Sequence, residues 1–509
     1  MSSGHYSTGR ARRSLLQFAV GKGLSAIVGI AVLLLSVRMM ATGEFGLYVA
    51  AIAFVEIFYL ATGFGLSTIA QRYVAEFRLK ADGKQFAGFL NGIMLRRILY
   101  ALAGAAAVGA AGALWASAGK VTPPAVQLPV FYALLVLGCI TRYADEIFPA
   151  LLLQGYTQGL LLASHLLRLG GLVACMAMNL TVGFEQMLLI EVAASLACSL
   201  GSLLLLRRYL ATDLPASGIS TPYANPLMAS VAGRFYVVQL LGQLWGPNTG
   251  KLIVVERLGL VATAAYGFVQ SITDMLRNYL PAYLLSSWVR PLMISRYLAR
   301  GDLQEVNAMA SLMFKLSLMC IVPAAAFFLA GGDVFVALAS GGKVTEGAVL
   351  LAAFCVLLAL QCLHVVISMI TVTVERANAS VVATLAACAA FPLSIAGAVS
   401  LGSAGVVAGM AAGECVWVAT VLVLLRREGL RIRLDARGSL LIMLSALPAY
   451  AAVKLLAMVT PALSPLWFTV FGLSLSGLLV LAVNALWKPF VAVERSFIVR
   501  LVPERCFVW

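Results

Sequence analysis

Long apolar runs recur along the whole chain, and they constrain its fold more than any other feature. A helix needs about 20 apolar residues to cross the hydrocarbon core of a bilayer. Divided by charges, glycines and prolines, the 509 residues contain about 14 such runs. Their approximate centres are residues 27, 55, 104, 140, 169, 196, 245, 273, 319, 359, 389, 415, 448 and 477. The sequence therefore predicts an all-α polytopic membrane protein with about 14 transmembrane helices.

Composition excludes a soluble fold. Hydrophobic residues make up 62% of the chain and charged residues 11%, and a soluble domain of this length has too little interior to hold so much apolar surface. The nine cysteines are scattered and form no CxxC pair, so we expect neither disulfides nor a metal site. The apolar stretch after Arg12 and Arg13 is too long for a signal peptide and is expected to be the first span.

Basic residues indicate the orientation in the membrane. With the N-terminus in the cytoplasm, most of the 36 lysines and arginines fall on the cytoplasmic side, including clusters at 72–84, 290–300 and 426–437. The exceptions near the outer side are Arg38, Lys120, Arg257, Lys343 and Lys454. Both termini are therefore predicted to be cytoplasmic. The net charge of +15 reflects this topology, with some attraction to anionic membrane lipid, and does not indicate a nucleic-acid partner.

The sequence contains a weak internal repeat. A shift of 218 residues places Tyr48 on Tyr266, and Arg72 on Arg290. A shift that spans six helices preserves orientation, so we expect two six-helix lobes related by a parallel repeat, followed by two C-terminal helices. The expected parts are the cytoplasmic N-terminus 1–13, the N-lobe 14–208, a cytoplasmic loop 209–232, the C-lobe 233–427, the last two spans 428–487 and the cytoplasmic C-terminus 488–509.

Several short motifs resemble one transporter family. They are Gly43 to Tyr48 (GEFGLY), Gly63 to Leu66 (GFGL), Gln71 to Glu76 (QRYVAE), Ala265 to Gly267 (AYG) and Arg290 to Asp302. Together with the span count, they resemble the polysaccharide-transporter flippases of the multidrug/oligosaccharidyl-lipid/polysaccharide exporter superfamily. This resemblance implies two lobes around a central cavity that opens alternately to each side. Its implied cargo is a polyprenyl-pyrophosphate-linked oligosaccharide, moved from the cytoplasmic to the outer leaflet of the bacterial inner membrane.

Charged residues inside the spans need a reason, because each costs about 2.5 to 3.5 kcal/mol at the bilayer centre. A pyrophosphate group needs cations when it leaves bulk water, and arginine suits phosphate through its planar fork. The candidate substrate-binding cations are Arg277, Lys22, Lys251, Arg142 and Arg168. A structural interpretation stays open for two of them. Arg142 can be neutralised on its own helix by Asp145 and Glu146, and Arg168 can brace a neighbouring helix.

Uncharged polar residues are the second set of cavity candidates. Gln239, Gln243, Gly246 and Gly250 recur at a spacing that places them on one face of a helix. Such a face is costly against lipid, so it should line a water-filled cavity, although small residues can also mark tight helix packing. The candidates for the cavity lining are Ser25, Gln239, Gln243, Asn248, Gln270 and Asn278.

Two intramembrane carboxylates, Glu56 and Asp274, occupy equivalent places in the two halves. A carboxylate withdrawn from water can carry a proton or bind Na⁺, so both are candidates for coupling to H⁺ or Na⁺. Pairing with Lys22 or Arg277 is the structural alternative. We expect no cofactor beyond such an ion.

Other function classes are less well supported. The chain has no large outer loop and no nucleotide-binding, protease or metal motif, so we expect no catalytic residue, no resident metal and no polysaccharide polymerase activity. A peptidoglycan-precursor flippase and a drug/cation antiporter of the same superfamily stay open as alternatives. Other membrane proteins of polysaccharide assembly are expected partners.

Overall fold

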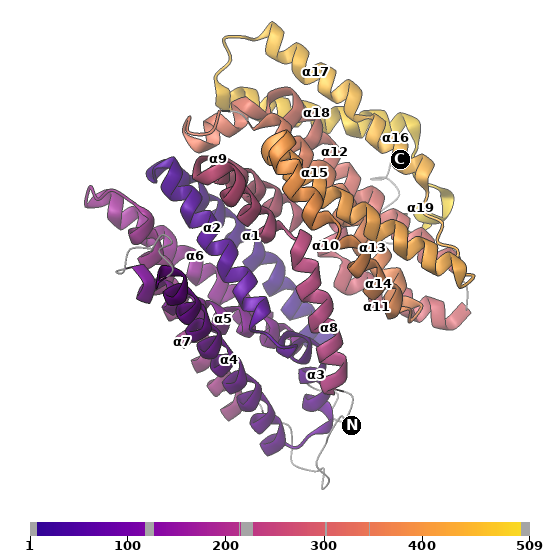
Figure 1. Cartoon of the computed structure of the whole chain (residues 1–509). Helices are drawn as coiled ribbons and strands as arrows, with labels where there is room; N and C mark the ends of the chain where they lie inside the picture. The colour runs from indigo at the N-terminus through magenta and orange to yellow at the C-terminus, as the bar shows by residue number, and fades with distance from the viewer. Residues whose placement is uncertain are drawn as a thin grey trace. The chain divides into compact units, whose positions relative to one another are not determined.

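The computed structural model describes residues 8–117, 127–212, 214, 228–300, 303–345 and 347–499, and every regular element in these ranges is a helix (Figure 1). The first eight helices are α1 (Thr8–Met39), α2 (Thr42–Ala61), α3 (Leu66–Lys80), α4 (Gly83–Ser117), α5 (Gln127–Ala150), α6 (Gln154–Ala177), α7 (Phe184–Thr212) and α8 (Met228–Gly242). After the short η1 (Gln243–Trp245) come α9 (Pro247–Arg277), α10 (Pro281–Leu284), α11 (Ser286–Arg300), α12 (Gln304–Ser340), α13 (Ala348–Thr373), α14 (Ala377–Ala387), α15 (Ala390–Arg427), α16 (Ala436–Leu444), α17 (Ala446–Val459), α18 (Pro465–Trp487) and α19 (Ala492–Val499).

The number of membrane spans agrees with the sequence. Within the described residues, 11 helical ranges are long and apolar enough to cross a bilayer. Two of these ranges, Met228–Arg277 and Asn378–Arg427, hold 50 residues each and correspond to two spans apiece. The 24-residue α5 also has spanning length, although its three charged residues keep it outside the apolar criterion. When each of these two ranges is counted as two spans and α5 is added, the 11 ranges give 14 spans. The protein is therefore a multi-pass membrane protein.

Two glycines turn long helices back on themselves. In α9 the backbone leaves helical geometry at Gly259, with φ 85° and ψ 179°, a conformation that only glycine adopts readily. A straight helix would separate Gly250 from Tyr266 by about 24 Å. Instead, a Cβ atom on Gly250 would lie 2.5 Å from the Tyr266 hydroxyl. The helix therefore folds into two antiparallel spans at Gly259, and Gly402 (φ 62°) plays the same part in α15.

The chain divides into two compact units, Met1–Gln243 and Leu244–Trp509. A broken helix recurs in each unit at the place that the repeat predicts. In the first unit α2 ends at Ala61 and α3 begins at Leu66; in the second, α9 ends at Arg277 and α11 begins at Ser286, 220 residues after Leu66. This recurrence agrees with two similar halves. The lobe limits proposed from the sequence, 14–208 and 233–427, stay predictions.

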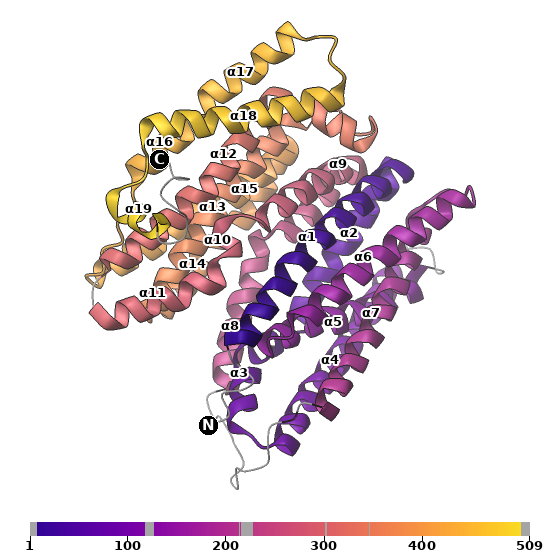
Figure 2. The ribbon, with the colours of Figure 1, turned by 180° about the vertical axis from the view of Figure 1, so that it is seen from behind.

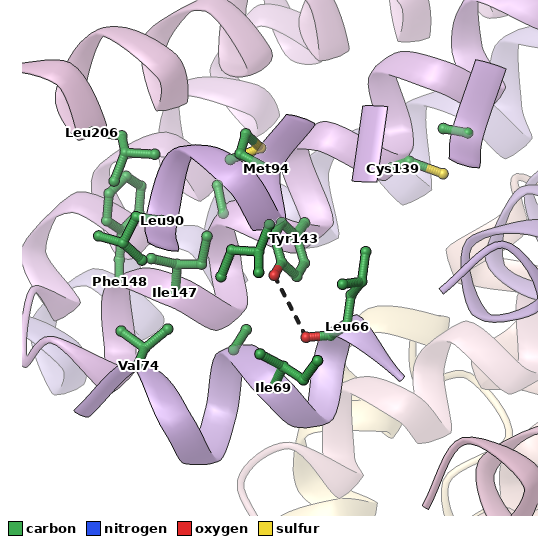
Figure 3. Packing of buried hydrophobic residues seen from close by; sticks show 14 of the residues in the cluster. Leu66, Ile69, Val74, Leu90, Met94, Cys139, Tyr143, Ile147, Phe148 and Leu206 are labelled. Carbon is green, nitrogen blue, oxygen red and sulfur yellow. Dashed lines mark hydrogen bonds between the residues drawn. The ribbon is translucent and has the colours of Figure 1, made fainter. Parts of the chain in front are cut away.

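The core of the first unit gathers around α5. Apolar side chains of α3, α4 and α5 interlock there, with Ile69, Met94 and Ile147 among the buried members (Figure 3). The buried Tyr143 hydroxyl donates a hydrogen bond to the Leu66 carbonyl, the first residue of α3, at 3.5 Å. This contact satisfies a polar group that has no water to pair with and fixes the start of the broken helix on α5.

In the second unit the C-terminal helices pack along α12. Both ribbon views place α16 to α18 beside it, and α12 contacts each of them (Figures 1 and 2). A small core joins Leu318 and Val322 of α12 to Ile442 of α16 and Val480 of α18. The Ser476 hydroxyl donates to the carbonyl of Pro323, at 2.8 Å. These contacts attach the last two spans to one side of this unit.

Many large apolar side chains point outward. Leu204 is 64% exposed, Val399 is 75% exposed and Leu486 is 80% exposed. Such side chains would favour aggregation in water, but they match a lipid surface. They support a bilayer as the surrounding solvent.

Candidate functional site

In the first unit, Glu56 of α2 holds Arg142 of α5. The Arg142 Nε donates to Glu56 Oε2 at 2.9 Å, and Nη2 donates to Oε1 in a second, short bond. Two parallel bonds of this kind form the strong bidentate arrangement of arginine with a carboxylate. The sequence-based pairing of Arg142 with Asp145 and Glu146 is therefore wrong. Glu56 competes successfully because it presents both oxygens to the guanidinium fork from a facing helix.

A second ion pair joins α6 to α7. Arg168 Nε donates to Glu191 Oε2 at 3.0 Å, and the Tyr48 hydroxyl donates to Glu191 Oε1 at 2.7 Å. Glu191 is only 3% exposed, so its charge depends on these partners. Arg168 thus braces a neighbouring helix, which is the structural alternative that the sequence left open.

In the second unit, Arg277, Asp274 and Gln270 share one face of α9. Arg277 Nη2 lies 3.1 Å from Asp274 Oδ1, and Gln270 Nε2 donates to Asp274 Oδ2 at 3.4 Å. These side chains line a small pocket together with Gln361 of α13. The pocket volume of about 10 Å³ is room for one water molecule, and the buried Gln270 Oε1 has no hydrogen-bond partner among the described residues. The pocket is therefore polar and suited to a water.

The polar stripe of the sequence analysis is not on one continuous helix. Gln239 lies on α8 and Gln243 on η1, while Gly250 follows on α9. The interruption has a local cause, because Pro247 cannot donate a backbone hydrogen bond and holds Gly246 in an extended conformation (ψ 164°). The prediction of a single continuous face was wrong.

The remaining candidates lie on several elements. Lys22 on α1 is half-buried, with its ammonium 5.1 Å from the centre of the Phe18 ring, and Lys251 is half-buried on α9. Ser25 is 4% exposed, Asn248 is half-buried and Asn278 is exposed. Glu56 and Asp274, the two carboxylates considered for ion coupling, each have an arginine as their partner.

The sequence analysis missed Arg97 of α4, which is fully buried. Its Nη2 donates to the Tyr59 carbonyl at 2.7 Å, and its guanidinium lies 4.3 Å from the Tyr59 ring centre. The carbonyls near the end of α2 lack helical partners, and Arg97 satisfies one of them. Its Nε and Nη1 have no hydrogen-bond partner among the described residues. In the sequence, Arg96 and Arg97 look like ordinary basic residues at the end of a span, so no signal distinguished them.

Two pairings between distant residues were also missed. His364 Nδ1 of α13 lies 2.6 Å from Glu414 Oε2 of α15. Lys315 of α12 is fully buried and donates to Glu494 Oε2 at 2.7 Å, to the Pro489 carbonyl at 2.8 Å and to Asp435 in a short bond. These partners lie 50 to 179 residues apart in the chain, so no local sequence pattern identifies them.

The two carboxylates around Lys315 respond differently to it. Burial raises the pKa of Glu494, and the hydrogen bond from Lys315 only partly opposes this. Burial also acts on Asp435, but the Lys315 ammonium and the backbone N–H of Gly438 outweigh it, so the pKa of Asp435 lies below its ordinary value. The difference follows from exposure, because the Asp435 side chain is 22% exposed and that of Glu494 is fully buried.

Comparisons with solved structures find the same fold in membrane transporters. "Lipid II flippase MurJ, inward closed conformation" matches at a TM-score of 0.63 and 13% identity, over 95% of this chain and 100% of that one. "Crystal structure of MATE in the bent conformation" matches at 0.55 and 15% identity, over 83% of this chain and 97% of that one.

An inward-facing multidrug resistance MATE family transporter of the MOP superfamily matches at a TM-score of 0.54 and 14% identity. That match covers 82% of this chain and 98% of the transporter. No protein-family model matches the chain, and no curated protein matches its sequence. The chain thus shares its fold with these flippase and transporter structures.

Proposed function

We propose that this protein is a flippase for polyprenyl-pyrophosphate-linked oligosaccharide. It moves the lipid-linked sugar from the cytoplasmic to the outer leaflet of the bacterial inner membrane by alternating access, for the export of surface polysaccharide. Both termini lie in the cytoplasm. The support is the fold, shared with flippases and transporters, together with the sequence motifs that resemble polysaccharide transporters.

The observation that carries this proposal is the extent of the structural matches. The MurJ match covers 95% of this chain, whereas a MATE match leaves 17% uncovered while covering 97% of the MATE chain. This uncovered share is about 87 of the 509 residues, similar in size to the 82 residues from 428 to 509 that contain the last two spans. A flippase of a lipid-linked precursor therefore resembles this chain over its full length, and the MATE transporters do not.

The pyrophosphate group of the proposed cargo matches the cationic side chains inside the spans. A pyrophosphate group that leaves water needs cations, and the candidates are Arg277, Lys22, Lys251, Arg142 and Arg168. Arg142 and Arg168 each hold a carboxylate through two nitrogens, which uses their forks for structure. Arg277 pairs with Asp274 through Nη2 and borders a polar pocket. We therefore propose Arg277 as the principal pyrophosphate ligand, with Lys251 of the same unit contributing, and Lys22 stays a candidate in the first unit.

Two alternatives keep specific support. A peptidoglycan-precursor flippase would have the same fold and a cargo with the same pyrophosphate linkage, and the MurJ match favours it. A drug/cation antiporter is favoured by the MATE matches, but these cover less of the chain.

Reconstitution tests the proposal directly. Purified protein is placed in liposomes that contain a fluorescent polyprenyl-pyrophosphate oligosaccharide, and a membrane-impermeant quencher reports which leaflet holds the label. We expect the protein to increase the rate at which the label reaches the quenched leaflet, and unlabelled substrate to compete. Equal rates with and without protein would reject the proposal. Stronger competition by the peptidoglycan precursor would favour the first alternative, and efflux of cationic dyes without lipid movement the second.

A further inference from the structure

His364 and Glu414 form an ionisable pair inside the second unit. His364 lies on α13 and Glu414 on the second half of α15, and both helices are apolar enough to span a membrane. The His364 Nδ1 and Glu414 Oε2 atoms are 2.6 Å apart. The side chains are 28% and 9% exposed, respectively. The two groups are thus in direct contact and mostly withdrawn from the surface.

Trp417 fixes the geometry of this pair. Its ring stacks on the imidazole with centres 3.6 Å apart and planes 8° from parallel. The indole N–H donates to the Thr384 hydroxyl at 3.2 Å, and Trp417 is 2% exposed. Because Glu414 and Trp417 are three residues apart on one helix, α15 contacts both an edge and a face of the imidazole. The imidazole therefore has one defined orientation toward the carboxylate.

The partner distinguishes Glu414 from the carboxylates that are paired with arginine. Glu56 faces Arg142, Glu191 faces Arg168 and Asp274 faces Arg277. An arginine keeps its proton at every physiological pH, so each of these three carboxylates faces a permanent cation. A histidine gains or loses a proton near neutral pH. Among these four pairs, therefore, only the one formed by His364 and Glu414 has a partner that is not a permanent cation.

The charge balance of the pair suits a proton carrier. Without an added proton, a neutral imidazole beside a carboxylate carries a charge of −1. With one proton, the pair is neutral, whether the proton lies on nitrogen or on oxygen. Net charge is costly in a membrane interior and cheap in water. The pair therefore favours holding one proton when it is enclosed and can release it when it is opened to water.

Other ionisable groups lie on the helices that pack against the pair. The helices packed against α13 and α15 include α9, α10, α12 and α14. The ionisable groups that interact with this region are Asp274 and Arg277 on α9, Tyr283 on α10, Cys320 on α12 and Cys362 on α13. Lys315 on α12 is occupied by Asp435 and Glu494, and α14 carries no ionisable residue. Asp274 and Arg277 balance each other, and α9 also carries the half-buried Lys251 and the exposed Glu256 and Arg257.

We propose that His364 and Glu414 form the proton-binding site that couples transport to a pH gradient. One proton enters the pair from the outer side and leaves toward the cytoplasm as cargo moves outward. This inference rests on the proposed transport function. It assigns coupling to His364 and Glu414 and not to Glu56 or Asp274, each of which is paired with an arginine.

Trp417 provides a test of proton binding that needs no substrate. A protonated imidazole quenches the fluorescence of an indole stacked on it, so the Trp417 signal should change with pH. The Trp417 signal is the fluorescence of the wild type minus that of the Trp417→Phe variant, with both proteins titrated in detergent. We expect one titration step that is lost in His364→Gln and whose midpoint moves by about one pH unit or more in Glu414→Gln. His165→Gln in the first unit is the matched control and should keep the step. A step that persists unchanged in His364→Gln would overturn the proposal.

Transport against a pH gradient tests the coupling. A gradient of one pH unit can sustain about a tenfold concentration ratio for each proton moved. In proteoliposomes with the fluorescent lipid-linked oligosaccharide, we expect the wild type, His165→Gln and Glu414→Asp to respond to the gradient. His364→Gln and Glu414→Gln should lose the response, so that their rates with and without a gradient become equal. Only variants that elute like the wild type in size-exclusion chromatography are compared.

The outcomes separate this inference from the proposed function. If the wild type moves no lipid-linked oligosaccharide but the Trp417 step depends on His364, the cargo assignment fails and the proton site stands. If the wild type moves the cargo and both substituted proteins keep the full response to the gradient, the proton site is rejected and the flippase stands.

Discussion

At the scale of single residues, the partner of a buried charge limits what that charge can do. Arg142 and Arg168 each bind a carboxylate through two nitrogens, and each of these ion pairs links two helices. Such partners could not be predicted from the sequence, because Glu56 and Arg142 lie 86 residues apart and only the fold brings them together. By contrast, the pairing of Asp274 with Arg277 was anticipated, since residues three apart on a helix share a face.

Arg277 is the residue whose role is most open to a decisive test. If it binds pyrophosphate, Arg277→Ala should abolish flipping with normal protein level, and Arg277→Lys should keep partial activity because it retains charge without the fork. Transport and abundance are measured for both.

A purely structural role of Arg277 predicts a different pattern. Removing one member of a buried ion pair commonly costs about 3 to 5 kcal/mol, less where water reaches the pair, because a charge is left uncompensated. The double variant Asp274→Asn with Arg277→Gln would then be more stable and more active than either single variant. Such a rescue would contradict the ligand assignment and leave Arg277 as a strut.

At the scale of helices, the sequence predicts spans well and their interruptions less well. Runs of about 20 apolar residues identify spans directly, because the bilayer sets the required length. The interruptions depend on single residues such as Pro247, Gly259 and Gly402, whose backbone conformations periodicity does not reveal. This is why the stripe from Gln239 to Gly250 was misassigned to one continuous helix.

Gly259 is predicted to be required for the turn within α9. Its φ of 85° with ψ of 179° strains any residue that has a Cβ atom. Gly259→Ala should therefore lower stability by about 1 to 3 kcal/mol, measured by thermal unfolding in detergent. Gly159 of α6 is the control: it has a helical backbone and open space at the Cβ position, so Gly159→Ala should be neutral or stabilising. Equal effects at the two sites would contradict the assigned turn.

The Lys315 cluster is predicted to hold the C-terminal helix. Lys315 is buried and binds Asp435 before α16, Pro489 after α18 and Glu494 on α19. Lys315→Met leaves two carboxylates without their cation, so we expect a loss of about 3 to 5 kcal/mol and faster proteolysis near residue 490. Lys454→Met, which removes a lysine outside this cluster, should digest like the wild type. Unchanged digestion of Lys315→Met would show that α19 is held by other contacts.

At the scale of the whole molecule, the placement of basic residues predicts the orientation in the membrane. Single cysteines in a cysteine-free background should react with an impermeant outer-side reagent at position 343 and not at positions 84 or 431. Position 120 is expected to react as well and lies outside the described residues. Outer labelling at position 84 would reverse the orientation and with it the proposed direction of transport.

Fold and cargo differ in how far the sequence predicts them. Helix number was predictable because the bilayer requires a similar length of every apolar span, and the repeat was predictable from residues that match at a shift of 218. Cargo identity depends on a few contacts, and the matching structures at 13 to 15% identity share the fold while carrying different names, a lipid II flippase and MATE transporters.

The location of lipid-linked oligosaccharide in cells that lack the protein tests the central claim most directly. On deletion of the gene, we predict that lipid-linked oligosaccharide accumulates on the cytoplasmic leaflet while surface polysaccharide falls, and that wild-type protein restores both. Arrival of these lipids at the outer leaflet at the normal rate, in a strain with no second flippase, would contradict the account.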